Sequence, residues 1–275
     1  MGSLREVFVF WRSSIAAGLL SAVLVVGSTT AGDTKSELYS FGSLKSSSVE
    51  TARTQAQAWL AKIGKADDAT RKQFEAIWAQ TDRPLLDKIG DTLSLDADTA
   101  KILKNVNDLT VNVPKEVPSA IKDKKNPTFY RANLAVLFAK AISSRRVYEE
   151  ALDALKAVKP EDVVDPSAYF FHKAVAEHAL MKRDEASQSI VRLLDDVSDA
   201  PERYKMVATL MFFDMQSWKR DEKDLLQISK LMDNSGRRLD LSRPGPKTQD
   251  IQKKIVFRLD EVIKELENMA KSGGT

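Results

Sequence analysis

Apolar residues recur every three or four positions through most of the chain, and the evenly alternating apolar and polar runs that an all-β fold needs do not occur. Such spacing places apolar side chains along one face of a helix. In the C-terminal half, the pattern forms pairs of segments, and a short polar turn divides each pair. The pattern therefore predicts an all-α protein.

Three short stretches repeat a proline that is followed three residues later by a tyrosine. They are NPTFY (126–130), DPSAY (165–169) and APERY (200–204), and their prolines, at positions 127, 166 and 201, lie 39 and 35 residues apart. Proline fits the first turn of a helix, and Asn126 and Asp165 precede it as candidate caps. Each stretch therefore predicts the start of a helix.

A basic doublet follows each predicted helix, and a second apolar segment of helical spacing begins after it. The doublets are Arg145-Arg146, Lys182-Arg183 and Lys219-Arg220, in steps of 37 residues. Each unit is thus predicted to be a helix, a polar turn and a helix. One hairpin of this size cannot bury its apolar face alone, so neighbouring hairpins are expected to stack.

This self-similarity resembles the tetratricopeptide class of helical-hairpin repeats. The matching positions in the middle unit are Phe170, Ala174, Ala186 and Ile190. Lys173 and Glu177 depart from the family's apolar positions, and the unit length varies. The resemblance implies a right-handed array of antiparallel helix hairpins, a tetratricopeptide-like α-solenoid with a long C-terminal helix.

Caps and prolines divide the rest of the chain. Ser47 followed by Glu50 predicts a capping box, and residues 47–109 are expected to form two shorter hairpins. Residues 110–126 contain two prolines and a basic run and are predicted to be a linker. The three hairpin repeats are expected over residues 127–236, before the chain-stopping RPGP at 243–246.

The last predicted helix, over residues 247–271, has an apolar seam of heptad spacing. The seam consists of Ile255, Leu259, Val262, Leu266 and Met269. Two roles fit this seam: the helix covers the open end of the array as a lid, or it pairs with another helix as a coiled coil. The coiled coil would allow a homo-oligomer.

The first 31 residues contain the three parts of an export signal. Arg5 and Arg12 form a positive region, residues 15–26 are apolar, and a small-residue cleavage site ends at Ala31. We expect a signal peptide over residues 1–31 and a flexible leader over 32–46. The mature protein is then periplasmic or otherwise extracytoplasmic and spans no membrane. The alternative is an uncleaved N-terminal helix that anchors the protein.

Composition and motifs narrow the classes of function. The chain has 42 basic and 39 acidic residues, a balance that does not favour nucleic acid as a partner, and its lack of cysteine excludes disulfides. The glycines form no phosphate loop, and there is no nucleophile-elbow or HExxH signature. The acidic pairs Glu149-Glu150 and Asp195-Asp196 are predicted to lie on solvated faces. We therefore predict no cofactor and no catalytic residue.

Both histidines of the chain, His172 and His178, lie in one predicted helix. Six residues of helix turn through about 600°, so the two side chains point about 120° apart and cannot bind one metal ion together. Glu177 is adjacent to His178 and faces a different direction. A structural role is therefore predicted for both histidines, and no metal site.

The whole chain resembles exported helical proteins of planctomycete bacteria. The stretches DRPLLDKIGDTLSL, YRANLAVLFAKA, VYEEALDALKAV and RRLDLSRPGP carry this resemblance. It implies export and an all-helical fold, and it implies no activity.

Together these features predict a non-catalytic helical-repeat scaffold or protein-interaction module of the cell envelope, with a protein partner there. The alternative is an enzyme that acts on cell-envelope polysaccharide through an acid site formed across the helices. The candidate partner-binding residues are Tyr130, Tyr169, Tyr204, Arg146, Arg183 and Arg220.

Overall fold

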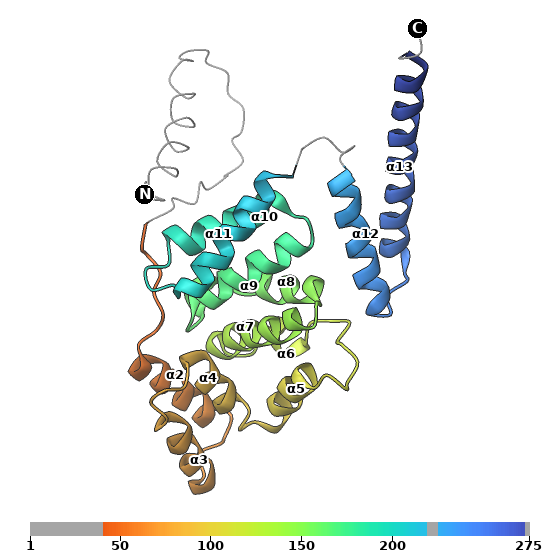
Figure 1. Cartoon of the computed structure of the whole chain (residues 1–275). Helices are drawn as coiled ribbons and strands as arrows, with labels where there is room; N and C mark the ends of the chain where they lie inside the picture. Colours follow the sequence, from red (N-terminus) through yellow and green to blue (C-terminus); the bar gives the residue numbers. More distant parts are fainter. Residues whose placement is uncertain (1–40, 219–224, 273–275) are drawn as a thin grey trace, which may run out of the picture. The chain divides into compact units, whose positions relative to one another are not determined.

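The computed structural model describes residues 41–218 and 225–272, and these residues form α-helices, one 3-10 helix and one isolated β-bridge, without a β-strand (Figure 1). The prediction of an all-α protein is confirmed. The predicted signal peptide, most of the predicted leader and Arg220 lie outside the described residues.

Short polar side chains start the N-terminal helices. These helices are α2 (Val49–Lys62), α3 (Asp68–Trp78), α4 (Leu85–Leu93) and α5 (Ala97–Asn107). The cap of α2 is Ser48, one residue after the predicted Ser47, and its side chain accepts a hydrogen bond from the Thr51 amide. Asp67 and Asp96 cap α3 and α5 in the same way. Each cap satisfies an amide that the first helical turn leaves unpaired.

The predicted linker contains a short helix, α6 (Ser119–Lys122), and part of it lies in the core. Ile121 is fully buried, and Val117 is buried beside it. The Asn126 side-chain amide donates to the Ala120 carbonyl, so Asn126 does not cap the following helix as predicted.

The next five helices contain most of the hydrophobic core. They are α7 (Thr128–Ser144), α8 (Tyr148–Lys156), α9 (Pro166–Ala179), α10 (Arg183–Asp195) and α11 (Glu202–Gln216), with a 3-10 turn at Pro160–Asp162. α7 packs against α8 and α9 against α10, while α11 packs on α9 and α10. The Asp165 side chain caps α9 at the Ala168 amide, as predicted.

The turns that join α7 to α8 and α9 to α10 have the same geometry. Arg146 and Met181 adopt left-handed backbone conformations, with φ of 61° and 59°. One residue later, the Val147 and Lys182 amides donate to carbonyls of the preceding helix, those of Ile142 and Glu177. This is the hydrogen bond of a Schellman C-cap, so the two turns share one motif.

The last two helices, α12 (Leu225–Asp240) and α13 (Pro246–Ser272), pack along each other (Figure 1). Ser242, with a φ of 56°, forms the turn after α12, and the Arg243 amide donates to the Arg238 carbonyl at 2.8 Å. In the predicted third repeat, α12 would pack along α11. Within the described residues it packs along α13 instead.

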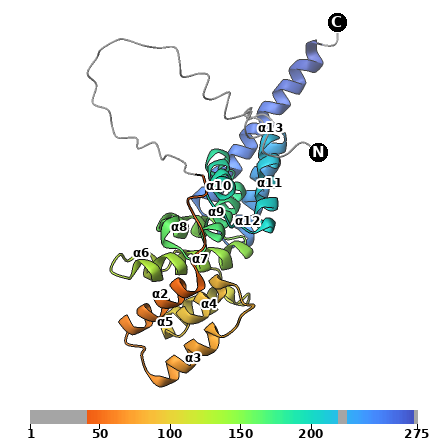
Figure 2. The same ribbon diagram turned by 90° about the vertical axis from the view of Figure 1, so that its left-hand side faces the viewer.

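Backbone hydrogen bonds hold the described end of the predicted leader. The amides of Gly42 and Leu44 donate to the carbonyls of Asp195 and Asp196, at 2.8 and 2.9 Å. The Ser47 amide donates to the Val164 carbonyl at 2.9 Å. Figure 2 shows this segment leading into α2.

Candidate functional site

A buried cluster of arginine and glutamate side chains attaches α12 to α8. Arg237 donates to both carboxylate oxygens of Glu149, at 2.9 and 2.8 Å, and Arg238 donates to the same carboxylate. Arg237 also donates to the Arg146 carbonyl at 2.9 Å. Charge-assisted bidentate pairs of this kind fix the relative orientation of the two side chains and also stabilise the contact. They therefore set the position of α12 against the turn at Arg146.

The neighbouring acid completes this cluster. Arg243 donates to Glu150 at 2.9 Å and to the Pro114 carbonyl at 3.0 Å. The side chains of Glu149 and Glu150 are only 12% and 11% exposed, so the prediction that this pair is solvated was wrong. Burial raises the pKa of Glu149, but hydrogen bonding and charge from Arg237, together with the charge of Arg238, outweigh burial and lower this pKa to about 2.

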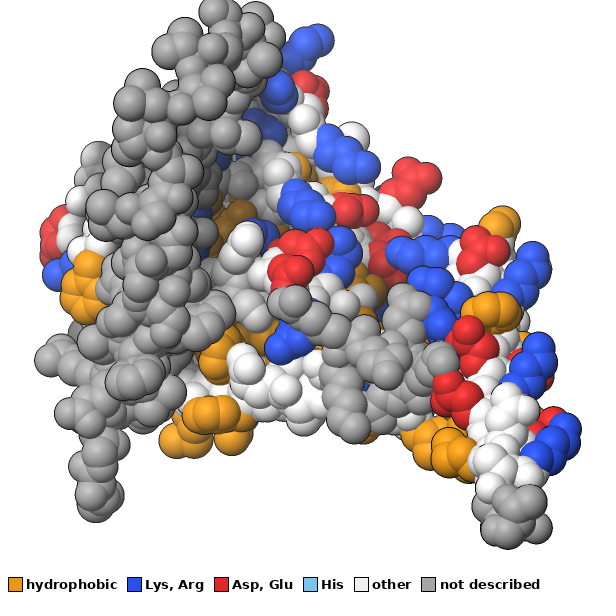
Figure 3. Space-filling view, turned by 90° about the horizontal axis from the view of Figure 1, so that it is seen from above, with side chains coloured by type: hydrophobic (Ala, Val, Ile, Leu, Met, Phe, Trp, Pro, Cys, Tyr) orange, Lys and Arg blue, Asp and Glu red, His pale blue; other side chains and the backbone are white. Residues whose placement is uncertain are grey.

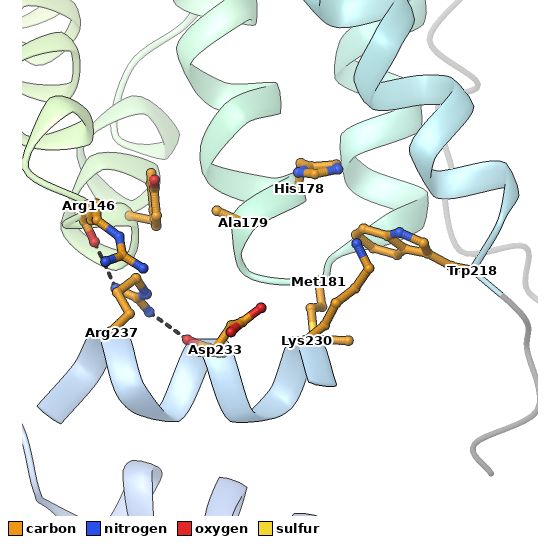
Figure 4. A pocket seen from close by; sticks show the side chains of 10 residues that line it. Arg146, His178, Ala179, Met181, Trp218, Lys230, Asp233 and Arg237 are labelled. Atoms are coloured by element: carbon orange, nitrogen blue, oxygen red, sulfur yellow. Dashed lines mark hydrogen bonds between the residues drawn. The ribbon is translucent and has the colours of Figure 1, made fainter. Parts of the chain in front are cut away.

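Next to this cluster is a cleft of about 200 Å³ (Figure 4). The two hairpin turns, the end of α9, Trp218 and α12 surround it. Its lining consists of Arg146, Tyr148, His178, Ala179, Met181, Trp218, Lys230, Asp233, Asn234 and Arg237. Aromatic rings and cationic groups dominate this lining, and Asp233 is its one carboxylate.

Asp214 on α11 receives three donors beside the cleft. Its carboxylate lies 2.8 Å from His178 Nε2, 2.9 Å from Trp218 Nε1 and 3.1 Å from Lys230 Nζ. Burial raises the pKa of Asp214, but the hydrogen bonds from His178 and Lys230 lower it overall. An ionised carboxylate has no proton to donate, so Asp214 is not an acid. Because it accepts hydrogen bonds from three side chains, Asp214 orients those side chains beside the cleft.

The arrangement does not resemble a carboxylate acid–base pair. Glu149 and Asp214 are kept ionised by their donors, and Asp233 faces the cleft without a second acid in the lining. Among the described residues there is no group of three or more potential ligands that could hold a metal ion. Because Arg237 and Lys230 are paired with Glu149 and Asp214, the cleft offers mainly ring faces and the exposed Arg146 to a bound group.

The three predicted partner-binding tyrosines lie in the core. The ring of Tyr130 stacks on Trp59, with centroids 5.3 Å apart, and that of Tyr204 stacks on Phe171, with centroids 4.1 Å apart. The Tyr169 hydroxyl donates to the Leu155 carbonyl at 3.2 Å. All three side chains therefore pack between helices, and at most 9% of each residue is exposed.

The predicted arginines have different positions. Arg146 lines the cleft, and its side chain is 58% exposed. Arg183 donates to the Trp218 carbonyl at 3.2 Å and thereby ties the start of α10 to the end of α11. The structure thus brings Arg146, but not Arg183, to the wall of the cleft.

The five residues of the predicted seam of α13 lie within about 80° of one another around the helix, but the chain does not cover them equally. Ile255 is buried and Val262 is half-buried on the side that packs on α12. Leu259, Leu266 and Met269 are exposed, the last two by about 60%.

The two histidines occupy separate environments, in agreement with their divergent directions along α9. His172 packs edge-on against the rings of Phe171 and Tyr204, and burial lowers its pKa to about 4. Glu177 is buried and accepts a hydrogen bond from Ser189 at 2.6 Å. Burial raises the pKa of Glu177. His172 and Glu177 thus contact the packed interior.

The sequence reasoning missed an exposed apolar stripe on α11. Met206, Leu210 and Phe213 are 66%, 62% and 55% exposed, and Val207 lies beside them. Their spacing of four and three residues puts them on one face. The sequence of α11 contained a signal of this stripe, because the helix has apolar residues on two faces. The other face, with Tyr204, Ala208 and Met215, is buried.

Charged side chains do not concentrate in a patch of one sign on the face that Figure 3 shows, where blue and red groups are interspersed. No described helix is both long and apolar enough to cross a bilayer. Comparison of the chain with protein-family models, with curated proteins and with solved structures finds no match.

Proposed function

We propose that this protein is a non-catalytic, exported helical-repeat scaffold of the cell envelope that binds a partner protein. The exposed apolar stripe of α11, formed by Met206, Leu210 and Phe213, is the observation that carries the proposal. Isolated exposed apolar residues are common, whereas a row of large ones along one helix is typical of a binding surface.

The stripe favours an amphipathic helix as the bound element. Its outer members are seven residues apart, which corresponds to about 10 Å, or two helical turns. A partner helix with anchors at matching intervals would cover all three side chains. The cleft next to Trp218 and the exposed Arg146 provide polar and cationic contacts close to the end of α11.

Two further parts of the proposal have separate support. The shared turn motif at Arg146 and Met181 supports a tetratricopeptide-like array of hairpins. The sequence of residues 1–31 supports export. Recovery of the protein from the cytosol with Met1 intact would contradict export without affecting the binding proposal.

The binding proposal is tested by charge substitution within the stripe. Leu210→Glu and Phe213→Glu are compared with Gln216→Glu, an exposed polar position on the same helix. After cross-linking in the envelope fraction, a partner is expected with the native chain and with Gln216→Glu, and it should be lost with the stripe variants. With the purified partner, each stripe variant should weaken binding by about 30-fold or more in calorimetry. A set of captured proteins that is the same for all four chains would refute the proposal.

A further inference from the structure

α13 has an apolar face that the rest of the described chain does not cover. Val256, Leu259, Ile263 and Leu266 follow one another at spacings of three, four and three residues, and each is 36% exposed or more. The side of α13 that packs on α12 contains a different row, with Thr248 and Ile255 buried. α13 thus has two adjacent apolar rows, and within the described residues only the row with Ile255 packs against another helix.

α12 has an exposed apolar row of its own. Leu225, Met232 and Leu239 recur every seven residues and are 63%, 54% and 45% exposed. In both helices, the exposed row lies about 50° around the helix from the buried row, which contains Ile228 and Ser235 on α12 and Thr248 and Ile255 on α13, in the same rotational sense. In an antiparallel pair of helices this puts both rows on the same side. The hairpin of α12 and α13 therefore has one extended apolar side.

We propose that a second copy of this chain covers this side, with its α13 antiparallel to the first. A two-fold axis near residue 261 would place Val256 against Leu266 of the second copy, and Leu259 against Ile263 of the second copy. Every apolar residue of the row then meets another apolar residue, and the spacing is the heptad spacing of a coiled coil. Such an interface is isologous, so it closes after two copies.

The charges along the edge of the row favour the second copy as the occupant. Lys253 and Glu267 are exposed at opposite ends of the row, on its solvent side, and neither forms an ion pair within the described residues. An antiparallel second copy would bring each Lys253 close to a Glu267, twice by symmetry. It would also bring the exposed Asp260, midway between them on the same edge, close to Asp260 of the second copy, so two opposite pairs stand against one like pair. A parallel second copy would place the two Lys253 side chains at the same height on opposite sides of the pair, and neither would meet a Glu267. Charges of opposite sign across a helix pair select partner and orientation.

This inference does not rest on the proposed function, because the stripe on α11 and the row on α13 share no residue. Sedimentation velocity of the purified chain over a range of concentrations should show a reversible dimer. Leu259→Glu combined with Leu266→Glu should weaken it by about 30-fold or more. Lys254→Glu is the control, because Lys254 is exposed about 100° around the helix from Lys253. Far-UV circular dichroism confirms that each variant remains folded.

Charge exchange tests the pairing itself. Lys253→Glu and Glu267→Lys should each weaken the dimer, and the double variant should restore it, because the pair is exchanged in both copies. The chain has no cysteine, so Lys253→Cys accepts a single spin label at a unique place. The antiparallel register predicts that two labels at residue 253 are separated by about 24 Å along the helix axis.

Each outcome decides the question. A dimer with the charge rescue and the long label distance supports the proposal. A chain that stays monomeric at every concentration overturns it, as does a dimer that tolerates both glutamates in the row. Labels at the same height, with no offset along the helix axis, would show a parallel pair and overturn the proposed register.

Discussion

Glu149 provides the sharpest test of how α12 is attached to α8. Its carboxylate receives Arg237 and Arg238, whose side chains are 4% and 9% exposed. Glu149→Gln would leave two buried guanidinium groups without their counter-charge. Loss of one member of a buried ion pair typically costs about 3–5 kcal/mol. We therefore expect a large loss of stability that begins at α12.

The pKa of Glu149 gives a second measure of the same interaction. Folding lowers this pKa from 4.5 to about 2, which corresponds to about 3 kcal/mol at neutral pH. Because the unfolded chain binds this proton more readily, the stabilisation is complete above about pH 4.5. It is lost as the pH falls from about 4.5 towards 2.

Urea unfolding and hydrogen exchange measure the effect. Glu149→Gln should lower the free energy of unfolding and speed amide exchange in α12 and α13 more than in the hairpin of α9 and α10. Asp153→Asn, at an exposed carboxylate on the same helix, is the control. A change within about 0.5 kcal/mol of the native chain, or an unaltered loss of stability between pH 4.5 and 2, would refute this reasoning.

Two further predictions concern α9. Burial lowers the pKa of His172 to about 4, so the native chain should lose stability as the pH falls from 6.5 towards 4. In His172→Gln, the urea midpoint should fall less over this pH range than it does in the native chain. An unchanged pH slope would contradict it. Glu177→Gln should keep the Ser189 hydrogen bond without a buried carboxylate whose pKa burial raises, and thermal unfolding at pH 7 should shift upward by about 2–4 °C. A lower midpoint of thermal unfolding would show that the ionised Glu177 carboxylate stabilises the fold, through its ion pair with Lys173 Nζ at 3.7 Å.

A local signal in the sequence predicted the start of α9 correctly. Asp165 accepts a hydrogen bond from the Ala168 amide, three residues further on. Asn126 has the same local context as Asp165, yet its side chain bonds to Ala120 instead. A short helix within the predicted linker provided that competing acceptor, and the spacing around Asn126 gave no sign of it.

The acidic pair at 149 and 150 shows the limit of sequence reasoning more clearly. Two adjacent glutamates on a helix usually indicate a face that is exposed to solvent. Their partners, Arg237 and Arg243, are 88 and 93 residues further along the chain. No periodicity links such positions, so only the fold could show that the pair is buried.

By itself, the sequence determined that the chain is helical and where helices such as α9 begin, because caps and apolar spacing act within a few residues. The tertiary structure decided that α12 packs along α13, that buried arginines attach it to α8 and that apolar rows on α11 and α13 stay exposed. The physical reason is that an amphipathic helix specifies which face is apolar, whereas contacts between distant segments select what covers that face.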